Sequence, residues 1–262
     1  MTSEASQFSC VKYIFFDLDD TLCGYWDACK RGLRETFAAH PVDGFTTDQM
    51  IRIWADSFKQ FAPTLKKTDW YPIYLKTGGP TRQELMRLVL ERAGCTDESR
   101  AAQLATTYAD RRNNHLKLFP DAIGTLEVLI QRGYRLGLIT NGPADVQRQE
   151  IATVGVERFF DPILIEGELG FGKPSSKVYE RAHELTLTPP SQIAMIGNSF
   201  AHDIVGAQKA GWKTVWVRRA SDVPPSADAD AKPEEMPEGA AAPDAIIGDL
   251  ATLKELFTAA SY

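Results

Sequence analysis

Three carboxylates fall within four positions at the end of one apolar run. The segment YIFFDLDDTL, residues 13–22, ends in Asp17, Asp19 and Asp20. Like charges this close repel one another and are costly to remove from water, so a bound cation is a reason to keep them together. In an extended strand Asp17 and Asp19 share one side of the chain, because side chains alternate with a period of two. The alternative is that these acids cap a turn or the next helix.

Two later segments carry groups that can hold a phosphoryl group. LITNG ends an apolar run in Thr140, Asn141 and Gly142. A hydroxyl and backbone N–H groups above a helix start can bind phosphoryl oxygens, although an ordinary helix N-cap is the alternative. In GELGFGKPSSKVY, Lys173 lies between a glycine-rich turn and Pro174. Its charge can neutralise a phosphate there, and a solvated surface lysine is the other interpretation.

A fourth segment, IAMIGNSFAHDIVG, places Asn198 and Asp203 at a strand-to-helix turn. Both can reach a metal ion, and both can instead cap the helix that follows. Each of the four signals is weak alone. All four fall at the carboxyl ends of successive predicted parallel strands, where open α/β sheets bind ligands, and this agreement favours a single site.

The elements that position these residues alternate between strand and helix. Short apolar runs predict strands at residues 13–18, 134–140, 162–167, 193–198, 213–219 and 245–249. Their nearly continuous apolarity is typical of strands that are covered on both faces. Helical patterns at 120–133 and 142–155 lie between them. The sequence therefore predicts an α/β fold, a doubly wound (Rossmann-like) parallel sheet.

One stretch interrupts this alternation. Between the first two strands only helical patterns occur, at residues 28–40, 47–61 and 80–94. We therefore predict an α/β core of residues 1–23 plus 116–262 and an inserted helical cap of residues 24–115. Within the core, residues 221–244 are rich in Ala, Pro, Asp and Glu and poor in large apolar groups, which predicts a flexible surface loop.

Composition narrows the classes of function. The net charge of −6 argues against nucleic acid or an anionic membrane as the main partner. The apolar runs are strand-sized, and the first ten residues show no secretory signal. The four cysteines form neither a CxxC pair nor a dense framework, which favours reduced thiols and a cytoplasmic location.

With these residues in place, the sequence resembles the haloacid dehalogenase (HAD)-like hydrolase superfamily. An apolar strand that ends in DxDx(T/V) is matched by Asp17, Asp19 and Thr21. The family's strand-terminal Thr or Ser, its lysine and its final acidic motif are matched by Thr140, Lys173 and Asp203. The resemblance covers essentially the whole chain, and a helical insert directly after the first motif is typical of members with a C1-type cap.

The resemblance implies roles for these residues. Asp17 is expected to attack phosphorus and form an aspartyl-phosphate, and Asp19 to act as general acid and then general base. Mg²⁺ is the expected cofactor, bound by a carboxylate oxygen of Asp17, the backbone carbonyl of Asp19 and the fourth-motif residues Asp203 and Asn198. Lys173 is expected to offset the charge repulsion between nucleophile and substrate.

The resemblance also implies how phosphate is held and which chemistry is favoured. Thr140 and the backbone of Asn141 are expected to hold phosphate oxygens, with Lys173. Asp19 favours phosphate chemistry, because family members that remove halide lack this second aspartate. Asn198 departs from the family's usual Asp and removes one negative charge, so we expect weaker metal affinity or direct metal contact by Asp203. Asp20 is expected to make only local hydrogen bonds.

The sequence therefore predicts a Mg²⁺-dependent phosphatase that acts on a small soluble phosphomonoester. A phosphomutase of the same family and a non-catalytic metal- or phosphate-binding regulatory protein stay open as alternatives. Substrate selection is assigned to the cap as a whole. Its aromatic residues, including Trp54 and Phe58, are expected mainly to pack its own core, and Lys66 to lie on a solvated helix face.

Overall fold

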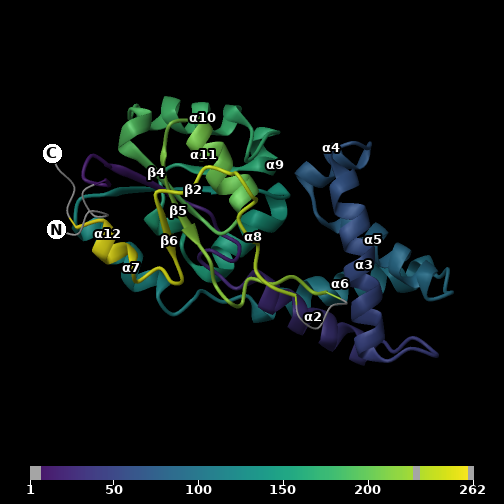
Figure 1. Ribbon diagram of the computed structural model, residues 1–262. Helices are drawn as coiled ribbons and strands as arrows, with labels where there is room; N and C mark the ends of the chain where they lie inside the picture. The colour runs from purple at the N-terminus through teal and green to yellow at the C-terminus, as the bar shows by residue number, and fades with distance from the viewer. Residues whose placement is uncertain (1–6, 227–230, 259–262) are drawn as a thin grey trace.

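The computed structural model describes residues 7–226 and 231–258. Six parallel strands form one sheet in the order β3-β2-β1-β4-β5-β6 (Figure 1). The strands are β1 (Tyr13–Phe16), β2 (Arg135–Thr140), β3 (Ile163–Ile165), β4 (Ile193–Gly197), β5 (Lys213–Val217) and β6 (Ala245–Ile247). The predicted doubly wound α/β class is confirmed.

The sheet is covered on both faces, which explains the continuous apolar runs. In β1, Tyr13 and Phe15 pack into a cluster that includes residues of α10 and α11. Ile14 and Phe16, on the opposite face, join a larger cluster with residues of α7, α8 and α12. Every side chain of β1 is therefore buried, and its sequence shows no polar alternation. The flanking helices are α7 (Ala122–Gln131), α8 (Ala144–Val154), α9 (Glu166–Leu169), α10 (Ser176–Thr186), α11 (Val205–Lys209) and α12 (Leu253–Leu256).

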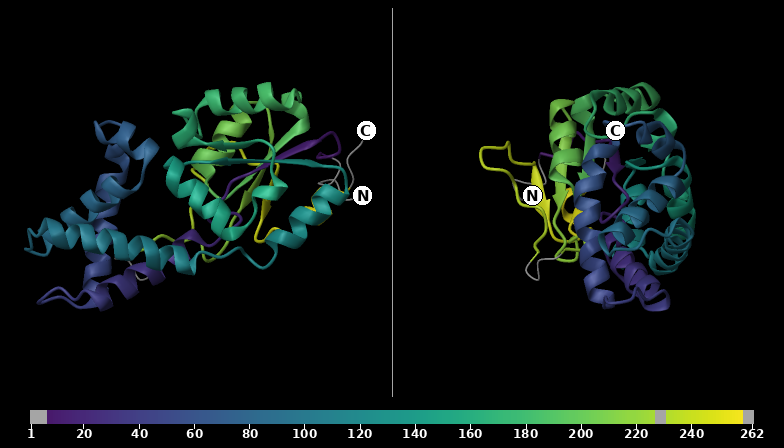
Figure 2. Two further views of the ribbon diagram at one scale, coloured as in Figure 1. Left: turned by 180° about the vertical axis from the view of Figure 1, so that it is seen from behind. Right: turned by 90° about the vertical axis from the view of Figure 1, so that its right-hand side faces the viewer.

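A separate group of helices follows β1 and has its own hydrophobic core. These helices are α2 (Tyr25–Ala39), α3 (Thr47–Leu65), α4 (Trp70–Lys76), α5 (Gly79–Arg92) and α6 (Glu98–His115). Figure 1, and the view from behind in Figure 2, show them at the end of the molecule opposite α7 and α12. This is the helical cap expected from the sequence. Among the described residues, no helix combines the length and apolarity needed to span a bilayer.

The chain leaves the core and returns to it at adjacent points. Cys23 pairs with Leu118 in an antiparallel bridge. Beside it, the backbone N–H of Gly24 donates to the carbonyl of Lys117 at 3.1 Å. The entry and exit of the cap are thus held together by backbone hydrogen bonds. The boundaries at residues 23/24 and 115/116 stay a prediction.

Polar contacts join the cap to the core near α4. Buried Glu166 of the core pairs with Lys66 at 2.7 Å and accepts a hydrogen bond from the hydroxyl of Tyr71 at 2.9 Å. The hydroxyl of Thr77 donates to Asp145 of α8 at 2.7 Å. Lys66 is exposed, as expected, and it also has a carboxylate partner from a distant core segment that folding brings beside the cap.

The described parts of the segment 221–244, residues 221–226 and 231–244, contain neither helix nor strand. Two of its carboxylates nevertheless reach the core. Asp222 accepts from the side-chain amide of Asn198 at 2.9 Å, and Glu234 accepts from the backbone N–H of Phe200 at 2.8 Å. Its flexibility stays a prediction, and residues 227–230 lie outside the described part of the chain.

Candidate active site

The first aspartate follows directly from the end of β1. The backbone N–H of Asp17 donates to the carbonyl of Ile196 in β4 at 2.9 Å, so the sheet fixes its position. The chain then turns sharply, with Asp20 in the left-handed region at a φ of 57°. The Asp20 carboxylate accepts from the backbone N–H of Trp26 in the first turn of α2 at 3.1 Å. The expected local hydrogen-bonding role of Asp20 is confirmed.

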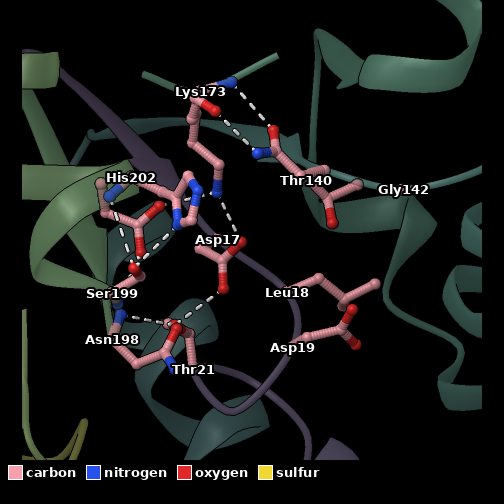
Figure 3. A network of polar contacts seen from close by, with 12 residues as sticks. Asp17, Leu18, Asp19, Thr21, Thr140, Gly142, Lys173, Asn198, Ser199 and His202 are labelled. Carbon is pink, nitrogen blue, oxygen red and sulfur yellow. Dashed lines mark hydrogen bonds and ion pairs between the residues drawn. The ribbon is translucent and has the colours of Figure 1, made fainter. Parts of the chain in front are cut away.

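A buried lysine joins two carboxylates of the site. The ammonium of Lys173 lies 2.5 Å from Asp17 Oδ1 (Figure 3). It also lies 2.7 Å from Asp203 Oδ1. Asn141 fixes the lysine through two reciprocal hydrogen bonds of 2.8 Å between its side-chain amide and the Lys173 backbone. The loop after β2 thus positions the lysine that pairs with the Asp17 carboxylate.

Asp203 approaches the sheet closely because β4 ends in a glycine. A Cβ atom on Gly197 would lie 2.2 Å from Asp203 Oδ2. The same Asp203 oxygen accepts from the backbone N–H of Ser199 at 2.9 Å. Any larger residue at position 197 would push this carboxylate away from Lys173.

Thr21 connects Asp17 with Asn198. Its hydroxyl donates to Asp17 Oδ2 at 3.0 Å and accepts from the backbone N–H of Asn198 at 3.0 Å. Figure 3 shows Thr21 on the side of Asp17 away from Lys173. The Asp17 carboxylate therefore has a defined partner on each oxygen, which holds it in one orientation.

Asp19 belongs to a second network that extends into α8. Its Oδ2 accepts from the amide of Gln147 at 3.1 Å. The carbonyl oxygen of the same amide accepts from the hydroxyl of Thr140 at 2.6 Å, and its nitrogen also donates to Glu150 at 2.9 Å. Glu150 in turn pairs at 2.7 Å with Arg112, which comes from α6 of the cap. Both members of this pair are buried.

The surroundings of Asp17 and Asp19 raise the pKa of the two carboxyl groups to different extents. Burial raises the pKa of Asp17 to about 6, although the charge of Lys173 opposes this shift. Burial, followed by the nearby charges of Glu150 and Asp17, raises the pKa of Asp19 well above its usual value. Burial disfavours the charge of Lys173, but its two carboxylate partners outweigh this and raise its pKa. The site thus favours a charged lysine and a protonated Asp19.

The donor set suits a hard cation. The carboxylates of Asp17 and Asp203 converge on one ammonium, and the side-chain oxygen of Asn198 faces the same region. Oxygen ligands of this kind are those that Mg²⁺ prefers. Within residues 7–226 and 231–258, no three His, Cys, Asp or Glu side chains group as a metal site. An amide and a backbone carbonyl would therefore have to complete the ligand set, so the residues present fit magnesium with few charged ligands.

Every residue that the sequence singled out for the site lines one cavity of about 560 Å³ between core and cap. These residues are Asp17, Asp19, Thr140, Asn141, Lys173, Asn198 and Asp203. Sequence reasoning missed Gln147, Glu150 and Arg112. A signal for the first two was present, because they occupy the buried face of α8 beside Val146 and Ile151. Polar residues on such a helix face mark a buried network.

Comparisons with known proteins agree with this geometry. The profile of a family described as haloacid dehalogenase-like hydrolase matches residues 14–217. A phosphoserine phosphatase of Thermus thermophilus is 31% identical over 95% of this chain and 99% of its own. A glyceraldehyde 3-phosphate phosphatase of Methanopyrus kandleri is 29% identical over 84% of this chain and 90% of its own.

Solved structures share the fold. A HAD hydrolase of Bacillus subtilis, solved bound to magnesium, superposes with a TM-score of 0.71 at 22% identity and covers 94% of this chain and 98% of its own. A 2-haloacid dehalogenase of Pseudomonas syringae superposes with a TM-score of 0.62 at 26% identity and covers 95% and 98%. The extent of the profile match and the near-complete coverage of the Thermus relative leave one conclusion: this chain belongs to the haloacid dehalogenase-like hydrolase family.

Proposed function

We propose that this protein is a Mg²⁺-dependent phosphatase that cleaves a small soluble phosphomonoester through an aspartyl-phosphate on Asp17. One observation carries the proposal. Buried Lys173 bridges Asp17 and Asp203, and the protonatable Asp19 lines the same cavity. A paired, oriented carboxylate beside an acid of raised pKa is the arrangement that nucleophilic attack on phosphorus and protonation of a leaving oxygen require.

The reaction follows from these two carboxylates. An Asp17 oxygen attacks phosphorus while the bond to the leaving oxygen breaks, and Asp19 gives that oxygen its proton. The deprotonated Asp19 then accepts a proton from water, whose oxygen attacks the phosphorus of the aspartyl-phosphate. This step releases inorganic phosphate and restores both side chains. The raised pKa of Asp19 favours the protonated form that the first step needs.

Other residues hold the phosphoryl group and its charge. Lys173 offsets the repulsion between the Asp17 carboxylate and an anionic substrate. Thr140 turns its hydroxyl toward Gln147 here, and the same hydroxyl can donate to a phosphate oxygen after a rotation about χ1. Magnesium, held by Asp17, Asp203, Asn198 and the Asp19 carbonyl, would supply further charge neutralisation of the phosphoryl oxygens.

The names of the relatives support a phosphomonoester as the substrate class. They are phosphatases of phosphoserine, glyceraldehyde 3-phosphate and N-acylneuraminate 9-phosphate, which share the monoester but not the alcohol. The monoester that these substrates share supports phosphomonoester hydrolysis as the reaction of this protein. The differences among their alcohols are consistent with substrate selection by the cap. Asp19 separates this chemistry from dehalogenation, in which no leaving oxygen needs a proton.

The direct test is hydrolysis of p-nitrophenyl phosphate. We expect release of free phosphate that depends on added Mg²⁺ and stops when the metal is removed by EDTA. Hydrolysis that EDTA leaves unchanged would contradict the metal requirement. A sugar phosphate that is isomerised without release of phosphate would indicate a phosphomutase instead. Absence of turnover with every divalent cation would favour the non-catalytic alternative.

A charge change at position 198 should alter metal affinity. Asn198→Asp adds a carboxylate to a ligand set that now has few, so we expect a roughly tenfold lower Mg²⁺ concentration for half-maximal activity. Without metal the variant should be less stable, because the new carboxylate faces Asp222 in place of an amide donor. Activity and thermal unfolding across a Mg²⁺ titration measure the two effects.

The control is the double variant Asn198→Asp/Asp222→Asn, which restores an amide–carboxylate pair with the charge on the other side. It should recover the metal-free stability while it keeps the gain in metal affinity. A Mg²⁺ dependence of Asn198→Asp that matches the unmutated protein would show that residue 198 lies away from the ion.

A further inference from the structure

One cation of the cap faces the cavity without a partner. Arg82 lies in the first turns of α5, is half-buried and lines the same cavity as Asp17. Within residues 7–226 and 231–258, no side chain or carbonyl forms a hydrogen bond or ion pair with its guanidinium. The other cap cations at this cavity are committed, since Lys66 pairs with Glu166 and Arg112 with Glu150.

This placement is unfavourable for the protein alone. A partly buried guanidinium without a hydrogen-bond or ion-pair partner loses part of its solvation. Burial, and then the charge of nearby Arg112, lower the pKa of Arg82. The charge of Asp145 opposes this shift only in part, and its hydrogen bonds come from Thr77 and Gly78 instead of Arg82. An anion that enters the cavity would provide the missing partner.

Aromatic and aliphatic side chains line the cavity together with Arg82. Trp54 and Phe58 line the cavity with their rings stacked, their centroids 5.1 Å apart and their planes at 6°. Leu85 and Tyr108 line the cavity as well. As expected, these aromatics pack in the core of the cap, and Trp54 and Phe58 line the cavity as well. An aromatic and aliphatic lining of this kind favours a ligand with a planar or apolar part.

We propose that Arg82 is a specificity residue, which selects phosphomonoesters whose leaving group carries a carboxylate on a planar or apolar body. The proposal rests on the proposed phosphatase function. One uncommitted guanidinium balances one carboxylate, and its planar fork matches the two carboxylate oxygens. A second phosphate, with two charges, would need another free cation. The phosphoryl group lies at Asp17 and Lys173, and the carboxylate lies under α5.

A matched pair of substrates tests this assignment. 4-Carboxyphenyl phosphate and phenyl phosphate differ by the carboxylate alone, and their kcat/KM ratio is measured with Mg²⁺ for each variant. Charge-assisted hydrogen bonds of this kind change affinity by roughly 10- to 100-fold, so Arg82→Met should lower the ratio by about that factor. Differences in leaving-group acidity cancel, because every variant meets the same two substrates.

The same helix supplies the control. Arg87 lies on the outer side of α5, where it pairs with Glu84 at 2.8 Å, and Arg87→Met should keep both the ratio and the activity. Arg82→Lys, which retains the charge but not the fork, should fall between the two. A ratio in Arg82→Met that equals that of the unmutated protein would overturn the assignment.

Binding measurements distinguish a failure of the Arg82 assignment from a failure of the proposed phosphatase function. If neither substrate is hydrolysed, the phosphatase proposal fails, and calorimetry with benzylphosphonate and 4-carboxybenzylphosphonate still tests Arg82. Tighter binding of the carboxylated compound that is lost in Arg82→Met would support the assignment without any turnover. Equal affinities, or no binding of either compound, would refute it.

Discussion

Asp17→Asn should reduce phosphate release by roughly 10³-fold or more, because an amide oxygen is too weak a nucleophile to form the aspartyl-phosphate. The substitution keeps the size of the side chain, and Lys173 keeps its contact with Asp203 at 2.7 Å. The fold should therefore survive while the chemistry is lost. Hydrolysis of p-nitrophenyl phosphate at saturating Mg²⁺, with thermal unfolding in parallel, measures both.

The same turn provides the control for this experiment. Asp20→Asn replaces another buried acid three positions along, and an asparagine can still accept from the backbone N–H of Trp26. Because Asp20 is expected to make only local hydrogen bonds, the variant should keep its activity. Full activity of Asp17→Asn would remove the proposed nucleophile, and equal losses in both variants would indicate damage to the turn.

Arg112→Met should destabilise the protein by about 3–5 kcal/mol, because it leaves the Glu150 carboxylate buried without its charge partner. The pair is inaccessible, with Arg112 at 3% and Glu150 at 0% exposure. Arg112 also lies over the ring of Tyr25, 5.2 Å from its centroid, so some packing is lost as well. The free energy of unfolding from urea denaturation gives the size of the effect.

Two further variants test whether the loss of stability in Arg112→Met comes from the ion pair with Glu150. Arg111→Met removes the neighbouring, half-exposed arginine, which lies 3.8 Å from Glu35, and should change stability by less than about 1 kcal/mol. Arg112→Met/Glu150→Gln removes both charges and should recover most of the loss. If Arg112→Met unfolds like the unmutated protein, the ion pair does not hold cap and core together.

The sheet and the edge that carries the site could be predicted from the sequence. Strands covered on both faces need apolar side chains at every position, so β1 and β4 stand out as uninterrupted runs. Because all strands are parallel, their carboxyl ends meet at one edge, and the polar residues that follow them gather there. The positions of Asp17 and Lys173 in one cavity follow from that topology.

The contacts between cap and core could not be predicted in the same way. Lys66 and Arg112 look like solvated helix residues, because nothing local in the sequence indicates their carboxylate partners. Glu166 and Glu150 lie far along the chain and meet them only after the insert folds back over the sheet edge. The contact of Asp222 with Asn198 was missed for a related reason, since an acidic, proline-rich composition suggests only a solvated loop.

The antiparallel bridge between Cys23 and Leu118, where the chain enters and leaves the cap, has an evolutionary consequence. Both ends of the five-helix insert leave the core at one pair of backbone contacts, so the strands need no change when the insert is replaced. Glu150 and Glu166, in contrast, would lose their cap partners and must change with it. Recombination at these two points could then join a different cap to the same sheet. New specificities would arise by exchange of the cap, while Asp17 and Lys173 keep the roles proposed for them.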